Sequence, residues 1–258
     1  MNWDEVQKAI FPTKSYEELC HRLKCSFNYL FVLNAYNFSM PALQDYTQRL
    51  LGEDPRGRYS AYNSTLRGIL AKLHRAGVGN VSGLIEKTST RDNLEILVNQ
   101  SGIPAVEIAM VLKYLLYWVV PSEKYLSSLV HSEIYLHEAI LRLRQVEIRL
   151  NLELLQISLT PVARRALAKS CGIPLTTLTE LVHRADFSRL PWASKATISN
   201  IIGAGYASLS WLANADPEQL VADFFRYGAS IGKNLKYGNE IENSYRIAKI
   251  IPRVVREG

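Results

Sequence analysis

The stretch that decides the fold is LAKSCGIPLTTLTELV, residues 167–182, with Cys171-Gly172-Ile173-Pro174 near its centre. It aligns without a gap with LVNQSGIPAVEIAMVL, residues 97–112, where Ser101-Gly102-Ile103-Pro104 takes the same place. Glycine is favoured where a chain leaves a helix with left-handed backbone, and proline is favoured in the first turn of a helix. Both stretches therefore predict two short helices joined by a tight turn.

A second pair of stretches repeats the same construction. LHRAGV at residues 73–78 parallels IIGAGY at residues 201–206, again with a glycine followed by an apolar residue. The next apolar side chain is expected to fold back onto the helix that has just ended. We interpret four glycines as structural turns at helix ends: Gly77, Gly102, Gly172 and Gly205. The predicted fold is all-α, a helical bundle of tandem units.

The rest of the chain also favours helix. Ser15-Tyr16-Glu17-Glu18 is a capping box, and Ser39 can cap a further helix that has Pro41 in its first turn. Residues 146–154 alternate as a strand would, but Leu, Arg, Glu and Gln favour helix, so a long helix is preferred for residues 132–157. The predicted division is an N-terminal helical region at 1–57, a first half at 58–121, a long connecting helix within 122–157, a second half at 158–232, and a basic helix or tail at 233–258.

The second half resembles the domain of unknown function 4332 family, a set of tandem helix–hairpin–helix modules. The resemblance lies in Leu167 with Gly172 and Ile173, the Ala185-Asp186 and Arg189-Leu190 pairs, the Ala204-Gly205 turn, and residues 214–220. Residues 70–112 resemble the opening part of the same domain. Helix–hairpin–helix modules hold a phosphate on the backbone N–H groups of a Gly-apolar-Gly hairpin, so the resemblance implies contact with a nucleic-acid backbone. The chain departs from the family at this place, because the hairpin glycines align with Trp192 and Ser194, and in the first half with Ser64 and Leu66.

The net charge of +6 and pI of about 9.2 favour an anionic partner, although a solvated basic face accounts for them equally well. Lys195 directly follows Ser194, a potential helix cap, and Arg189 flanks the same hairpin. Arg164 and Arg165 occupy a helix start, where the helix dipole disfavours cations unless an anion docks. The candidate nucleic-acid-binding residues are therefore Arg164, Arg165, Arg189, Ser194 and Lys195, and ordinary solvated charges remain the alternative.

Catalytic motifs are lacking: the sequence has no P-loop, dinucleotide fingerprint, Gly-x-Ser-x-Gly or His-Glu-x-x-His. The three cysteines lack the paired spacing of zinc knuckles, and they favour a reducing cytosol. No stretch reaches the ~20 apolar residues of a membrane span. We expect a non-catalytic adapter or scaffold without metal or cofactor, which binds nucleic acid non-specifically or binds a nucleic-acid-associated assembly. The alternatives are a protein–protein interaction module with purely structural hairpins, or a regulatory subunit of an enzyme complex, and a homo-oligomer is left open.

Overall fold

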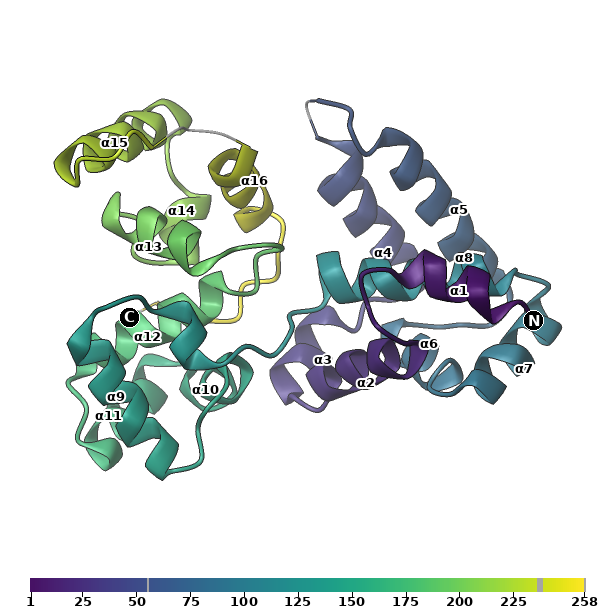
Figure 1. Cartoon of the computed structure of the whole chain (residues 1–258), viewed down its shortest axis with the longest axis horizontal. Coiled ribbons are helices and arrows are strands. Elements are labelled where there is room, and N and C mark those ends of the chain that lie inside the picture. Colours follow the sequence, from purple (N-terminus) through teal and green to yellow (C-terminus); the bar gives the residue numbers. More distant parts are fainter. Residues whose placement is uncertain (55, 236–238, 258) are drawn as a thin grey trace. The chain divides into compact units, whose positions relative to one another are not determined.

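The computed structural model describes residues 1–54, 56–235 and 239–257, and the chain forms two compact units, Met1–Ser122 and Glu123–Gly258. Helices joined by turns make up both units (Figure 1). The described residues form no strand, only isolated bridges between Ser39 and Asn80 and between Tyr125 and Leu150. The predicted all-α fold is confirmed.

The first unit is built around α8 (Ala105–Tyr114), which packs against α1, α2, α5 and α7. Ile108 and Leu112 of α8 are fully buried, and each such side chain contributes about 1.5–3 kcal/mol relative to exposure. Ser15 and Ser39 cap α2 and α4 through their hydroxyls, as the sequence predicts. The remaining elements are α1 (Trp3–Ile10), α2 (Tyr16–Phe27), α3 (Leu30–Tyr36), α4 (Met40–Thr47), the π-helix η1 (Gln48–Gly52), α5 (Ser60–Arg75), α6 (Val81–Lys87), α7 (Arg91–Ser101) and the π-helix η2 (Leu115–Val119).

The second unit is built around α12 (Leu175–Phe187), which packs against α9, α10, α11 and α14. Its last turns are buried on every side, polar residues included. The other elements are the 3₁₀-helix η3 (Leu126–Leu129), α9 (Ile134–Gln145), α10 (Asn151–Ser158), α11 (Pro161–Cys171), α13 (Lys195–Gly203), α14 (Leu209–Ala213), α15 (Pro217–Ser230) and α16 (Asn239–Ala248).

A four-helix repeat underlies both units. Repeat 1 is α5–α8 and repeat 2 is α9–α12, with equivalent residues 70 positions apart, such as Thr90 and Thr160 at helix caps or Gly102 and Gly172 at left-handed turns. The backbone around the first turn also matches. The N–H of Met40 bonds to the Gly79 carbonyl as the N–H of Leu126 bonds to that of Arg149. The correspondence therefore includes the preceding segment as well as the four helices.

Repeat 3 is α13–α16, within the second unit. Its first turn has left-handed Gly205 (φ 103°), and Gly232 (φ 66°) follows its third helix as Gly102 (φ 66°) follows the third helix of repeat 1. All four glycines that the sequence assigns to structural turns have positive φ and lie just after a helix. Gly77 and Gly205 separate the first and second helices of repeats 1 and 3, whereas Gly102 and Gly172 separate the third and fourth helices of repeats 1 and 2.

The predicted long helix through residues 132–157 is wrong. The chain turns between α9 and α10, where Glu147 is left-handed (φ 64°) and the N–H of Ile148 bonds to the Leu143 carbonyl at 3.0 Å. The same bond joins Val78 to Leu73 at 3.0 Å beside Gly77. Glu147 therefore occupies the position that glycine has in the first turn of repeat 1. Because glutamate is not typical of a left-handed turn, the sequence does not indicate a turn here. The expected connecting helix is the first half of repeat 2.

Two further expectations concern the ends of the repeats. Ser64 and Leu66, aligned with hairpin glycines from the sequence, lie inside α5, so that hairpin assignment is wrong. The basic region at 233–258 contains α16, and its residues 236–238 and 258 lie outside the described residues. Among the described residues, no single helix is long and apolar enough to cross a membrane. One pair of helices, Arg91–Ser101 and Ala105–Val119, has the length and composition of a membrane span, but the two helices are bent by 118° relative to each other.

Candidate functional site

The five candidate residues do not form one surface. Arg164 in α11 is only 4% exposed and donates to the carbonyls of Ser158, Leu159 and Arg256. Burial lowers the pKa of its guanidinium, and the nearby Glu257 carboxylate raises it. An arginine enclosed in this way bonds to the protein itself and presents little of its guanidinium to a phosphate.

Arg189 is also enclosed. Its side chain is 1% exposed and pairs with Asp186 at 2.5 Å, and a further N–H donates to the Pro252 carbonyl at 2.9 Å. Burial raises the pKa of Asp186, which Arg189 lowers in part. Arg164 and Arg189 thus both bond to the segment that follows α16, a contact that no local sequence pattern indicates.

The other three candidates are exposed. Arg165 lies on α11, while Ser194 caps α13 by accepting from the Thr197 N–H at 3.1 Å, and Lys195 begins that helix. The tip of this connection is Trp192, left-handed at φ 60° and 53% exposed. A tryptophan thus holds the backbone conformation that favours glycine, where the sequence alignment placed a hairpin glycine.

The first turns of the repeats, each within a single unit, are further candidate sites that the sequence did not reveal. They comprise residues 76–80, 146–150 and 204–208. In repeat 2 the Glu153 carboxylate accepts from the N–H groups of Arg149 at 2.7 Å and Leu150 at 2.8 Å. This is the reciprocal half of a capping box, and it also demonstrates that two consecutive amides of this turn converge on one anionic oxygen.

Repeat 1 has the same turn without the carboxylate. The residue equivalent to Glu153 is Gly83, and the amides equivalent to those of Arg149 and Leu150 belong to Gly79 and Asn80. Within the described part of the chain, no hydrogen bond engages the Gly79 or Asn80 N–H group. A Cβ at Gly77 or Gly79 would meet open space, so the backbone here is accessible. Gly77-Val78-Gly79 is itself a Gly-apolar-Gly sequence, the signal that could have identified this turn.

Basic side chains lie in the helical turn before this site. Lys72, His74 and Arg75 are exposed in the last turn of α5, and Arg142 and Arg144 take the positions of Lys72 and His74 in α9. Lys72 pairs with Glu107 at 2.7 Å, and Arg142 donates to the Gly172 carbonyl. Lys72 and Arg75 also line a hollow beside Gly102. Cations at a helix C-terminus are favoured by the helix dipole, which is sufficient reason for their placement.

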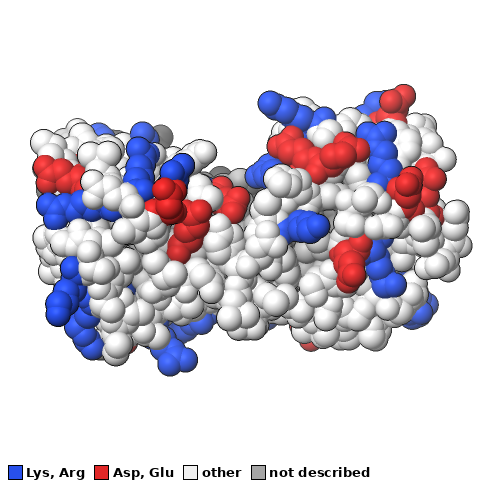
Figure 2. Space-filling view, turned by 90° about the horizontal axis from the view of Figure 1, so that it is seen from below, with Lys and Arg blue, Asp and Glu red and all other residues white. Residues whose placement is uncertain are grey.

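The wider surface carries charges of both signs. Figure 2 shows acidic side chains among the basic ones over both units on the face it presents, with basic side chains along the outer edge of the left-hand unit. The described residues contain no group of three or more His, Cys, Asp and Glu side chains that could hold a metal ion. The candidate site in repeat 1 is thus a pair of backbone amides with basic side chains in the preceding helical turn.

Comparison with protein families gave a match to "Domain of unknown function (DUF4332)" over residues 135–236. Neither the curated proteins nor the solved structures gave a match. The matched range runs from α9 to the residues just after α15, through repeat 2 and most of repeat 3. It includes the Gly172 and Gly205 turns, whose residues carry the sequence resemblance. Residues 135–236 therefore match the DUF4332 family model, as the resemblance of the second half indicates.

Proposed function

We propose that the chain is a non-catalytic adapter that binds the sugar-phosphate backbone of nucleic acid through the 76–80 turn. The observation that carries the proposal is the amide pair of Gly79 and Asn80. Its counterpart in repeat 2 holds a carboxylate oxygen at 2.7 and 2.8 Å, and Gly83 leaves the pair of repeat 1 without such a group. A phosphate oxygen is an anionic acceptor of similar size, and two charge-assisted bonds would orient it.

The cations of α5 support the same assignment. Lys72 and Arg75 are exposed within the two turns that precede Gly77, and neither needs to leave a buried position to approach a phosphate. Contacts of this kind position a protein on a nucleic-acid backbone without reading bases. The expected binding is therefore independent of base sequence and falls with salt, by a log–log slope of about −0.9 for each neutralised phosphate.

The matched variants Gly83→Glu and Gly83→Gln test the proposal. Both variants replace a helix glycine with a good helix former, and the two new side chains are equal in length. Only glutamate, however, supplies the carboxylate that Glu153 supplies in repeat 2. We expect Gly83→Glu to weaken binding of a fluorescein-labelled DNA duplex at 50 mM salt by about 10- to 100-fold, the equivalent of one charge-assisted contact. Gly83→Gln should retain the affinity of the unsubstituted protein. Equal affinity of the two variants would remove the amide pair as the site.

A charge-matched pair of double variants tests the cations. Lys72→Gln with Arg75→Gln should lower both the affinity and the salt slope, whereas Lys8→Gln with Lys24→Gln, exposed elsewhere in the first unit, should change neither. Equal effects of the two pairs would mean that net charge alone drives binding.

A protein–protein interaction module is the second candidate. Ile134 and Leu141 project from α9 seven residues apart, 74% and 58% exposed, and Val146 follows at 50%. Exposed apolar side chains on one helix face are typical of a protein contact. Absence of duplex binding at 50 mM salt by the folded, unsubstituted chain would favour this second function.

A further inference from the structure

Residues 249–257, here termed the terminal strap, cross the second unit without forming a helix. Main-chain groups of the strap make the strongest contacts. The Arg256 N–H donates to the Leu159 carbonyl at 2.9 Å, and the carbonyls of Pro252 and Arg256 accept from Arg189 and Arg164 at 2.9 and 2.8 Å. Two buried cations thus recognise the strap through its backbone, which any extended peptide also has.

Side chains anchor the strap less extensively. Ile251 is 6% exposed and is its most buried residue, while Glu257 approaches His183 at 3.7 Å and Arg253 donates to Asn214 at 3.5 Å. One apolar side chain therefore fixes the position of the strap on the second unit, with polar contacts after it.

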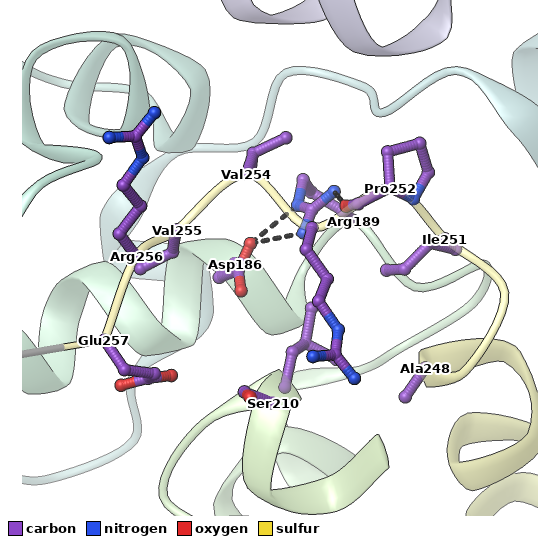
Figure 3. A pocket seen from close by; sticks show the side chains of 12 residues that line it. Asp186, Arg189, Ser210, Ala248, Ile251, Pro252, Val254, Val255, Arg256 and Glu257 are labelled. Carbon is purple, nitrogen blue, oxygen red and sulfur yellow. Dashed lines mark hydrogen bonds and ion pairs between the residues drawn. The ribbon is translucent and has the colours of Figure 1, made fainter. Parts of the chain in front are cut away.

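The strap covers its groove without filling it. A cavity of about 320 Å³ remains between the strap and the helices, lined among others by Asp186, Arg189, Leu209 and Ser210 (Figure 3). One oxygen of Asp186 accepts both bonds from Arg189, and Figure 3 shows the other turned away from that guanidinium. We use the term groove for the surface of the second unit that the strap covers together with this cavity. Release of the strap would therefore expose a groove that the strap fills only in part.

The groove also remains satisfied without the strap. Arg189 keeps its ion pair with Asp186, and Arg164 keeps its bonds to the carbonyls of Ser158 and Leu159 at 3.3 and 3.4 Å. Loss of the strap would therefore leave neither buried cation without a partner, which removes the largest penalty for opening such a site.

We propose that this groove is a binding site for an extended peptide, occupied here by the strap of the same chain and open to the strap of a second copy. The ligand class is a peptide that offers two main-chain carbonyls four residues apart and an apolar anchor at the position of Ile251. The proposal concerns the second unit and is independent of nucleic-acid binding at the 76–80 turn.

The test uses the full chain and a fluorescein-labelled peptide, KIIPRVVRE, with the sequence of the strap. Ile251→Asp in the full chain weakens the resident strap but leaves the groove intact, and Ile134→Asp places the same substitution at a site 74% exposed. We expect the peptide to bind Ile251→Asp at least about tenfold more tightly than the unsubstituted chain or Ile134→Asp, since the resident strap competes less. A peptide with aspartate at the anchor position should not bind. Equal affinity for all three proteins, or no binding to any, would overturn the proposal.

Hydrogen exchange of the unsubstituted chain provides a second measurement that does not depend on a variant folding. If the strap opens by itself, the Arg256 amide should exchange at least about tenfold faster than the buried amides of α12, through local rather than global unfolding. Exchange of Arg256 at the rate of the α12 amides would show that the strap opens only when the whole unit unfolds, and would also overturn the proposal.

Discussion

Replacing Glu147 with glycine should relieve backbone strain in the second unit. Glu147 is left-handed at φ 64°, a conformation that costs an L-residue about 1–2 kcal/mol and costs glycine little. Glycine adds about 0.4–1 kcal/mol of unfolded-state entropy, so the net gain from the backbone is about 0.5–1 kcal/mol. Equivalent turns in repeats 1 and 3 already contain glycine, at Gly77 and Gly205.

The side chain of Glu147 requires a matched control. Its carboxylate pairs with Arg149 at 2.7 Å, but both side chains are more than half exposed, and such pairs contribute about 0.2–1 kcal/mol. Glu147→Ala loses the same pair and keeps the strained backbone. The difference between the glycine and alanine variants, about 0.5–1 kcal/mol in favour of glycine, isolates the effect of the backbone.

Urea unfolding followed by circular dichroism gives the required free energies of unfolding. The converse substitution, Gly77→Ala, should lower the stability of the first unit by a similar amount. If Glu147→Gly is no more stable than Glu147→Ala, residues 146–150 do not form a left-handed turn equivalent to residues 76–80, and the assignment is refuted.

Two further predictions concern the second unit. Arg164→Glu should lower the free energy of unfolding of this unit by more than about 3 kcal/mol, because the new carboxylate would be buried against three carbonyls. The control is Arg165→Glu at an exposed position, which should change the free energy by less than about 0.5 kcal/mol. Thermal melts measure both variants, and similar melting temperatures would contradict the burial of Arg164. Burial lowers the pKa of His183 despite the opposing effects of Glu257 and Asp186, so the unfolded chain takes up this proton more readily than the folded one. The stability of the second unit should therefore fall as pH is lowered from 7.5 to 5.5, through the ordinary histidine pKa of about 6.5. His183→Gln should reduce that fall. An identical pH dependence of the melting temperature in the unsubstituted chain and in His183→Gln would contradict the buried, neutral imidazole.

The helix ends were largely predictable from the sequence, because glycine and capping serine act locally. Gly102 and Gly172 lie in left-handed turns, and Ser15 and Ser39 accept bonds from the helices they precede. The turn at Glu147 could not be predicted in this way, since a glutamate gives no local indication of positive φ.

The candidate site was harder to predict, because burial depends on segments distant in sequence. Arg164 and Arg189 are enclosed by residues 249–257, so their sequence neighbours gave no indication of burial. The amides of Gly79 and Asn80 are a candidate site because Glu153 bonds to the equivalent amides of repeat 2. This relation is evident only when the two repeats are compared in the structure. Gly77-Val78-Gly79 is a local signal in the sequence, but the family resemblance places the hairpin glycines of the first half at Ser64 and Leu66 instead.

The most direct test of the proposed function follows the backbone ¹H–¹⁵N signals of the full chain during titration with a short DNA duplex at 50 mM salt. The amide signals of Gly79 and Asn80 should shift and saturate together, while those of Arg149 and Leu150, already bonded to Glu153, should not move. Unchanged Gly79 and Asn80 signals at saturating duplex would contradict the account.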